Sequence, residues 1–181
     1  MTNTSGQYDA VSSYCRELYM KKMRDYGSSW RVLRPSSLTD QIMIKARRIR
    51  SIDEKGTQKV NDGVKGEFIG ILNYSVMALI QIELNNYEDI NLGMDEGLKL
   101  YDKYVAEAKK LMEDKNHDYG EAWRDMRIGS IDDIILMKLH RIKQIEDNKG
   151  VTSVSEGVEA GYFDMINYAA FALILIDENE Q

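Results

Sequence analysis

Two pairs of cations lie in the sequence where a phosphate could bind. Lys45 and Arg48 stand three residues apart in an apolar segment, and Lys138 and Arg141 repeat this arrangement. At about 100° per residue, each lysine falls within a helical stripe of leucine and isoleucine side chains. A lysine in such a stripe must extend to water or meet an anion, because an unpaired buried charge costs several kcal/mol. Two interpretations stay open: a structural ion pair within the fold, and an anion site, for phosphate, formed by these cations.

Candidate counter-charges lie on one narrow stripe of the last apolar segment and on its counterpart in the first half. The members are Glu156, Ala160, Asp164 and Asn167, and in the first half Asp62, Gly66, Gly70 and Asn73. The two asparagines sit among apolar neighbours and therefore need hydrogen-bond partners. Two glycines inside a helix cost roughly 1 kcal/mol each relative to alanine. Their presence indicates the close approach of a neighbouring helix or of a ligand.

The two halves differ at their acidic positions. We most expect Asp164 to be functional, because the first half has Gly70 in its place. Glu67 is likewise present only in the first half, opposite Gly161. This asymmetry fits one competent and one degenerate site, or one composite site, and it equally fits drift on a surface.

An aromatic and basic motif, Asp-Tyr-Gly followed by Trp-Arg, occurs once in each half. Its aromatic members, which could stack on a flat base, are Tyr26, Trp30, Tyr119 and Trp123. Its arginines, Arg31 and Arg124, could bind a phosphate through two parallel hydrogen bonds. The alternative is an aromatic cluster that anchors a loop, with the arginine in a salt bridge.

These motifs belong to a tandem repeat that predicts how they are positioned. Matching residues lie 93 positions apart, and the offset becomes 94 after residue 149. Each copy has the apolar spacing of three helices. Gly27 and Gly120 predict the end of the first helix, and a capping box at Ser37 and Ser130 predicts the start of the second. The third helix is expected over about 62–86 and about 155–177, with Ser153 and Glu156 as the later cap.

The expected fold is all-α, a six-helix bundle built from two pseudo-symmetric three-helix repeats. Repeat 1 covers residues 1–90 and repeat 2 covers 91–181, and because each is small we expect one shared core. Such a molecule is expected to be a monomer with an internal pseudo-two-fold axis, or a homodimer.

The composition excludes several classes of protein. One cysteine and two histidines do not make a disulfide scaffold or a zinc finger. A net charge of −6 argues against nucleic-acid binding, and it disfavours an RNA-binding helical repeat in particular. The first residues lack the pattern of a signal peptide, and the longest apolar run, 168–176, is shorter than the roughly 20 residues of a membrane span. We expect a cytoplasmic protein.

The segments KNHDYGEAWR (115–124), KLHRI (138–142), VSEG (154–157) and DMINYA (164–169) together resemble the nucleotide-modification-associated domain family, type 1. That family is similar, more distantly, to the MazG-like all-α nucleoside triphosphate pyrophosphohydrolases. The resemblance implies Mg²⁺ held by Glu156 and Asp164, and cleavage between the α and β phosphates. It also implies phosphate-binding roles for Lys138 and Arg141, and it matches Asn167 to the family's Asn-Tyr.

The chain departs from the MazG-like pattern at its carboxylates. Met137 stands where an acidic residue is expected before Lys138, and Gly161 removes the Glu-x-x-Asp pair that would end at Asp164. Our main hypothesis is a nucleotide-binding protein, and its fuller form adds Mg²⁺-dependent (d)NTP pyrophosphohydrolase-like activity with Glu156, Asp164 and Lys138 as catalytic residues. The alternative is a non-catalytic helical scaffold or interaction protein that uses the same charges as an internal ion-pair network.

Overall fold

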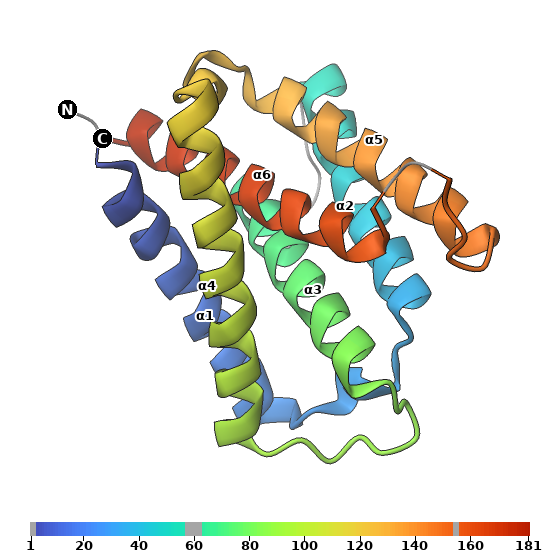
Figure 1. Ribbon diagram of the computed structural model, residues 1–181. Coiled ribbons are helices and arrows are strands. Elements are labelled where there is room, and N and C mark those ends of the chain that lie inside the picture. Colours follow the sequence, from blue (N-terminus) through green and yellow to red (C-terminus); the bar gives the residue numbers. More distant parts are fainter. Residues whose placement is uncertain (1–2, 57–62, 154–155) are drawn as a thin grey trace.

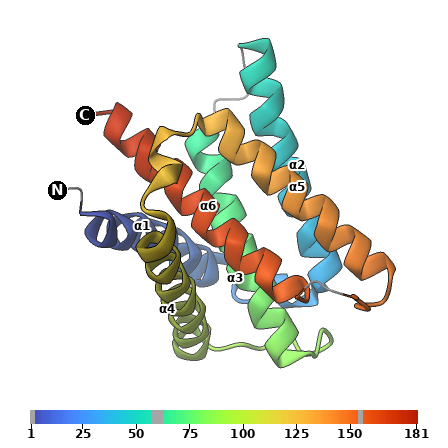
Figure 2. The same ribbon diagram turned by 45° about the horizontal axis from the view of Figure 1, so that its top comes forward.

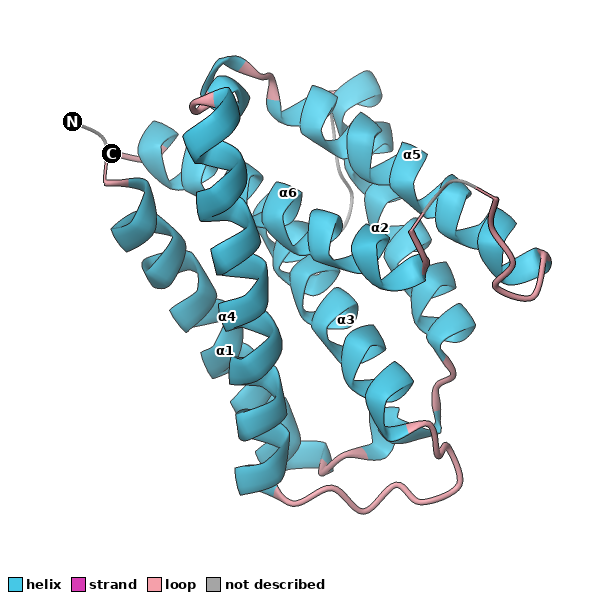
Figure 3. Ribbon diagram, viewed as in Figure 1, coloured by secondary structure: helices cyan, strands magenta, loops and turns pink. Residues whose placement is uncertain are grey.

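The computed structural model describes residues 3–56, 63–153 and 156–181, and within these ranges it contains helices and no strand (Figure 3). Six α-helices follow one another along the described part of the chain (Figure 1). They are α1 (Thr4–Tyr26), α2 (Pro35–Lys55), α3 (Val64–Leu84), α4 (Met94–Tyr119), α5 (Ile128–Asp147) and α6 (Val158–Asn179). Two 3-10 helices, η1 (Ser29–Val32) and η2 (Ala122–Asp125), follow α1 and α4. The expected all-α, six-helix fold is confirmed.

The element boundaries repeat with the offset of the sequence. The helices η1 and η2 start at residues 29 and 122, and α2 and α5 start at 35 and 128, which is 93 positions in both cases. The helices α3 and α6 start at 64 and 158, 94 positions apart. Residues related by these offsets are called equivalent below.

The helices stack in three layers, and each layer is a pair of equivalent helices. The pair α3 and α6 lies in the middle, with α2 and α5 packed on one side and α1 and α4 on the other (Figure 2). Both middle helices are apolar on nearly all sides, which is typical of helices that are buried all round. A hydrophobic cluster joins the halves and includes the fully buried rings of Phe68 and Tyr162. The middle layer therefore presents its few polar side chains to both outer layers.

The middle helices also explain a hydropathy signal. By length and composition alone, α3 and α6 are apolar enough to cross a membrane. In the structure, 67% and 61% of their most apolar windows are buried inside the protein, as core helices would be. The unbroken apolar run at 168–176 is much shorter than these apolar helices, because single polar residues and glycines interrupt the longer apolar stretches.

The predicted ends of the first helices are confirmed, whereas the predicted starts of the second helices are wrong by two residues. Gly27 and Gly120 end α1 and α4 with positive φ angles of 64° and 65°, a conformation that L side chains rarely adopt. The second helix begins two residues before Ser37, at Pro35, and in the other repeat at Ile128. Proline favours the first helical position because its φ is already helical and it lacks the N–H that would be unpaired.

The expected serine caps are absent for the same reason. No side chain caps α2 or α5, because Ser37 and Ser130 lie inside the first turn. Gly157 occupies the N-cap of α6, so Ser153 lies too far upstream to cap it. Asp62, expected at the start of the third helix, lies outside the described residues.

Two buried asparagines tie the middle layer to α1 and α4. Asn73 Nδ2 donates to the carbonyl of Cys15 over 3.0 Å, and its Oδ1 accepts from the Tyr101 hydroxyl over 2.6 Å. Asn167 makes the equivalent pair of bonds, to the carbonyl of Ala108 and from the hydroxyl of Tyr8. Each asparagine therefore holds the first helix of its own repeat and a tyrosine of the other repeat.

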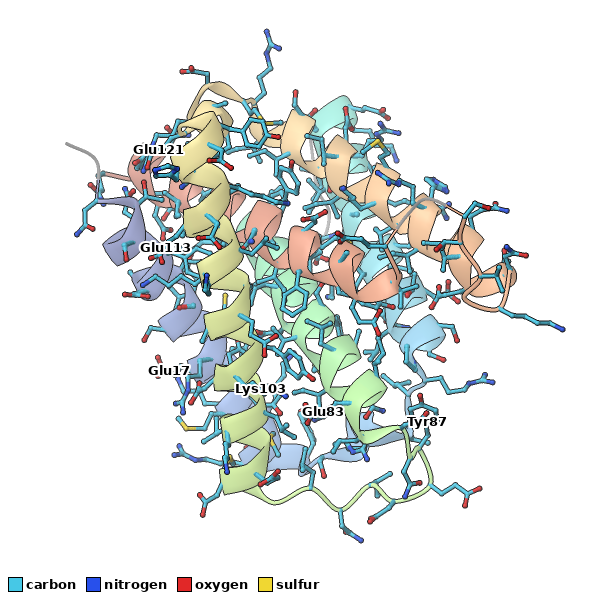
Figure 4. The ribbon with its side chains drawn as sticks, in the orientation of Figure 1. Glu17, Glu83, Tyr87, Lys103, Glu113 and Glu121 are labelled. Carbon is cyan, nitrogen blue, oxygen red and sulfur yellow. The ribbon has the colours of Figure 1, made fainter. Side chains whose placement is uncertain are left out.

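A surface ion pair reinforces the contact between α3 and α4. Lys103 of α4 pairs with Glu83 of α3, and both are labelled in Figure 4. The Tyr104 hydroxyl donates to the same carboxylate over 2.8 Å. These two hydrogen bonds lower the pKa of Glu83.

Candidate functional site

A pocket of about 390 Å³ opens in the first repeat, between the last turns of α1, the helix η1, Lys45 of α2 and residues 66–77 of α3. We call it the repeat-one pocket. Much of its wall is aromatic: Tyr19, Tyr26, Trp30 and Tyr74. The cations that line it are Lys22 and Lys45. Its volume lies within the range of small-molecule sites, which is about 300–1,000 Å³.

Lys45 reaches this pocket by crossing Gly70. A Cβ built on Gly70 would lie 2.8 Å from Lys45 Cδ and 2.7 Å from Cε, so the stem of the lysine occupies the space that a side chain at position 70 would need. The ammonium group lies 5.5 Å from the centre of the Tyr74 ring, within reach of a cation–π attraction. The glycine inside α3 is thus explained by the close approach of a lysine, and it allows that lysine to reach the pocket wall.

Lys45 shares its carboxylate partner, Glu67, with Arg48, which lies closer to that carboxylate. Arg48 Nη1 donates to Glu67 Oε1 over 2.8 Å, whereas Lys45 Nζ lies 3.7 Å from Glu67 Oε2. The 3.7 Å separation is too long for a normal hydrogen bond, so among the described residues no carboxylate accepts a hydrogen bond from this ammonium group. About a quarter of the Lys45 side chain remains exposed. Lys45 is therefore a cation that an anionic ligand could approach from the pocket.

The second repeat neutralises its lysine differently. Asp164 receives two ammonium groups, with Lys138 Nζ at 2.9 Å from Oδ2 and Lys115 Nζ at 2.9 Å from Oδ1. A smaller cavity of about 210 Å³ adjoins this cluster. Its lining brings together four residues that the sequence singled out: Lys138, Arg141, Glu156 and Asp164. We call it the repeat-two cavity.

The carboxylates of the repeat-two cavity do not fit the expected Mg²⁺. The Asp164 carboxylate is already engaged by Lys115 and Lys138, and both would have to be displaced. Within the part of the chain that the structure describes, no group of three or more His, Cys, Asp and Glu side chains could hold a metal ion. Mg²⁺ needs near-octahedral oxygen coordination and is bound through carboxylates and substrate phosphates, so ammonium groups at the same carboxylate oppose it.

The two arginines of the Trp-Arg motif, Arg31 and Arg124, line neither cavity and take partners within the fold. Arg31 is buried and donates to the side chain of Gln81 and to the carbonyl of Asn86. Arg124 donates to Glu121 over 2.6 Å and to Glu178 over 2.8 Å. Arg124 thus forms the salt bridge of the alternative interpretation, whereas Arg31 binds an amide and a carbonyl group.

The two predicted aromatic residues of the second repeat differ in burial. Tyr119 is 78% exposed, and the structure shows no ring contact for it. Trp123 is buried and stacks on Phe171, with ring centres 4.2 Å apart and planes at 4°. Asn73 lines the repeat-one pocket, but its amide is committed to the helix contacts described above, as is that of Asn167.

Sequence reasoning missed several residues that line the repeat-one pocket, and two of them, Lys22 and Met77, could have been found from the repeat. Lys22 was not singled out, although Lys115 is its equivalent and the pair is therefore kept in both repeats. Met77 was not singled out because methionine carries no charge, although its equivalent is the stacked Phe171. The signal that could have found both was the comparison of the two repeats, position by position, along the faces of α1 and α3.

The carboxyl group of Asp132, which lies outside both cavities, has a strongly raised pKa. Asp132 is 1% exposed, and neither of its carboxylate oxygens has a hydrogen-bond partner among the described residues. Burial raises the pKa of Asp132 to about 7, Asp133 and Asp53 add to this shift, and Arg50 opposes it. The equivalent residue, Thr39, lies 2.6 Å from the Tyr162 hydroxyl and is satisfied.

Comparison with known proteins identifies the family. A sequence model described as nucleotide modification associated domain 1 matches the chain twice, over residues 22–82 and 115–176. No curated protein and no solved structure matches the chain. The second matched range contains all the lining residues of the repeat-two cavity, and the first contains those of the repeat-one pocket except Leu18 and Tyr19. The chain therefore belongs to the nucleotide modification associated domain 1 family and carries two copies of that domain in tandem.

Proposed function

We propose that this protein binds a nucleotide in the repeat-one pocket, with the base against the aromatic wall and phosphate at Lys45. The observation that carries the proposal is the position of Lys45, whose ammonium group reaches an aromatic pocket while its carboxylate partner is held by Arg48. An ammonium group is a common ligand for phosphate, and aromatic rings stack on any base. The name of the family agrees with a nucleotide ligand.

The proposal is limited to binding. The pyrophosphohydrolase activity expected from the MazG-like resemblance depends on a carboxylate-bound Mg²⁺, and Asp164 is engaged by two lysines instead. With a net charge of −6 the protein suits a single nucleotide better than a polynucleotide, whose binding depends on many cationic contacts.

Isothermal titration calorimetry with a panel of nucleoside mono- and triphosphates, with and without Mg²⁺, tests the proposal. Lys45→Met is expected to weaken binding by about tenfold or more, as the loss of one charge-assisted contact would. Lys138→Met is the matched control in the other repeat and should bind as the unmodified protein does. If no nucleotide gives heat, the proposed function is wrong.

A second candidate function is a scaffold held by internal ion pairs. The observation that favours it is the short contact of each repeat, 2.9 Å for Lys138 with Asp164 and 2.8 Å for Arg48 with Glu67. In a scaffold these charges serve only the fold, so well-packed apolar replacements should be tolerated. Lys45→Met with unchanged stability and no nucleotide binding by the unmodified protein would favour the scaffold.

A further inference from the structure

We infer that the ligand of the repeat-one pocket is a nucleoside monophosphate in a definite pose, with its base parallel to Trp30 and its phosphate between Lys22 and Lys45. The inference rests on the proposed function and adds the class of nucleotide and its orientation. Its basis is that repeat two places an aromatic ring, Phe171, and a carboxylate, Asp164, at positions where repeat one has Met77 and Gly70.

The first of these side chains occupies the position of the base. In repeat two, the Phe171 ring lies parallel to Trp123, with centres 4.2 Å apart and planes at 4°. The equivalent residues in repeat one are Met77 and Trp30, and both line the pocket. Because methionine is slender and flexible, it leaves room for a flat group on the tryptophan. Parallel stacking of a base on Trp30 would reproduce the contact that repeat two makes internally.

The second side chain occupies the position of the phosphate. The Asp164 carboxylate accepts from Lys115 and Lys138, each over 2.9 Å. Their equivalents in repeat one are Lys22 and Lys45, and both line the pocket. Position 70 of α3 supplies no carboxylate to these lysines, because the residue equivalent to Asp164 is a glycine. An anionic group of the ligand beside Lys22 and Lys45 would make the same two contacts.

The distance between the two positions suits a nucleotide. Residues 164 and 171 are seven positions apart on α6, and a rise of 1.5 Å per residue puts them about 10.5 Å apart along the axis. This separation leaves room for a sugar between a stacked ring and an anionic group. Tyr168 lies between them on α6 and meets Phe171 edge-on, with ring centres 6.1 Å apart. Its equivalent Tyr74 lines the pocket of repeat one and would border the sugar.

The number of available cations limits the number of phosphates. Among the described residues that line the pocket, the cations are Lys22 and Lys45. Arg48, three residues after Lys45 on α2, is held by Glu67 at 2.8 Å. Two ammonium groups match one phosphate, which carries about two negative charges at neutral pH. Two further phosphates would bring negative charge with no cation to meet it, so a triphosphate should bind more weakly.

The test exchanges the two residues between the repeats. Gly70→Asp with Met77→Phe introduces the side chains of repeat two into repeat one, and should abolish binding of nucleoside 5′-monophosphates while the chain keeps its helical circular-dichroism spectrum. Asp164→Gly with Phe171→Met opens the equivalent space in repeat two. Added to Lys45→Met, this second pair should restore monophosphate binding at a site that depends on Lys138 and Lys115.

The outcomes separate the inference from the proposed function. Calorimetry is expected to show one site in the unmodified protein, and a monophosphate bound about tenfold or more tighter than the triphosphate of the same base in the absence of Mg²⁺. If the unmodified protein binds nucleotides but the Gly70→Asp, Met77→Phe variant binds them equally well, the pose is wrong and the proposed function stands. A triphosphate that binds more tightly than the monophosphate overturns the assigned class. If the unmodified protein binds no nucleotide, the proposed function itself is wrong.

Discussion

Gly70 and Asp164 occupy equivalent positions, and each lies against the lysine of its own repeat. The Gly70 position is filled by the stem of Lys45, whereas the Asp164 carboxylate pairs with Lys138 over 2.9 Å. Repeat one draws its carboxylate from Glu67 instead, one helical turn earlier. Both repeats thus keep the lysine, whereas its carboxylate partner lies one helical turn earlier in repeat one than in repeat two. The lysine of repeat one lines an open pocket, and in repeat two the Asp164 carboxylate lies between two lysines.

Replacing Gly70 by alanine should separate helix stability from lysine position. Alanine favours a helix over glycine by about 1 kcal/mol, but the new methyl group would lie 2.7 Å from Lys45 Cε and must push that side chain aside. We expect thermal unfolding to shift little and nucleotide binding to weaken by about tenfold.

Gly66→Ala is the matched control for this change. A Cβ on Gly66 would meet nothing within 4 Å, so this variant should gain the full stability of about 1 kcal/mol and leave Lys45 in place. Equal effects of the two alanines on binding would show that the position of Lys45 does not matter.

Asp132 should make stability depend on pH in an unusual direction. Burial raises its pKa from 3.8 to about 7, so the folded state holds a proton that the unfolded state releases above about pH 4. The contribution of this group therefore falls as pH rises from 3.8 to about 7. Arg50 lessens the effect, and Asp53 and Asp133 increase it.

Urea unfolding of the unmodified protein and of Asp132→Asn at several pH values measures this contribution. Because asparagine does not titrate, the stability of the unmodified protein relative to the variant should fall between pH 4 and pH 7 and then level off. A difference that stays constant with pH would show that Asp132 is ionised in the folded protein.

Replacing either buried asparagine by alanine should lower the unfolding free energy by the same amount. Asn73→Ala leaves the Tyr101 hydroxyl and the carbonyl of Cys15 without their partner, and Asn167→Ala does the same to Tyr8 and Ala108. An unpaired buried polar group costs about 1–3 kcal/mol, so each variant should lose at least about 2 kcal/mol of unfolding free energy.

A double-mutant cycle checks that the loss comes from the hydrogen bond between repeats. Tyr101→Phe removes only one partner of Asn73, and its effect should not add to that of Asn73→Ala. Full additivity of the two changes, or very unequal costs of Asn73→Ala and Asn167→Ala, would contradict the symmetric arrangement.

Much of the arrangement of helices could be predicted from the sequence, because the two repeats can be compared with each other position by position. The glycine stops at Gly27 and Gly120 and the apolar spacing located six helices. The helix starts were missed, since the serine signal competes with Pro35, whose fixed φ begins α2 earlier. Local signals of similar strength cannot be ranked without knowing how the helix packs.

The candidate site was predicted in part. The cluster of Lys138, Arg141, Glu156 and Asp164 was expected, because helical spacing puts these residues on facing stripes. The partners of each charge were not predictable, since a salt bridge depends on how far two helices are turned toward one another. Arg124 illustrates this: its sequence neighbourhood suggests phosphate binding, and it pairs with Glu121 and Glu178 instead.

Replacing both Lys138 and Asp164 should lower the unfolding free energy less than replacing Asp164 alone. Asp164→Leu leaves Lys115 and Lys138 without their carboxylate, and because the lysine at 138 is mostly buried we expect a loss of about 2 kcal/mol of unfolding free energy. Lys138→Met combined with Asp164→Leu removes the buried ammonium group as well and replaces both by apolar side chains of similar length. Chemical unfolding should place this double variant within about 1 kcal/mol of the unmodified protein, because apolar packing often replaces a buried ion pair without loss. A double variant as unstable as Asp164→Leu alone would mean that the cluster contributes through Lys115, and that repeat two depends on the carboxylate itself for the position of α4 against α6.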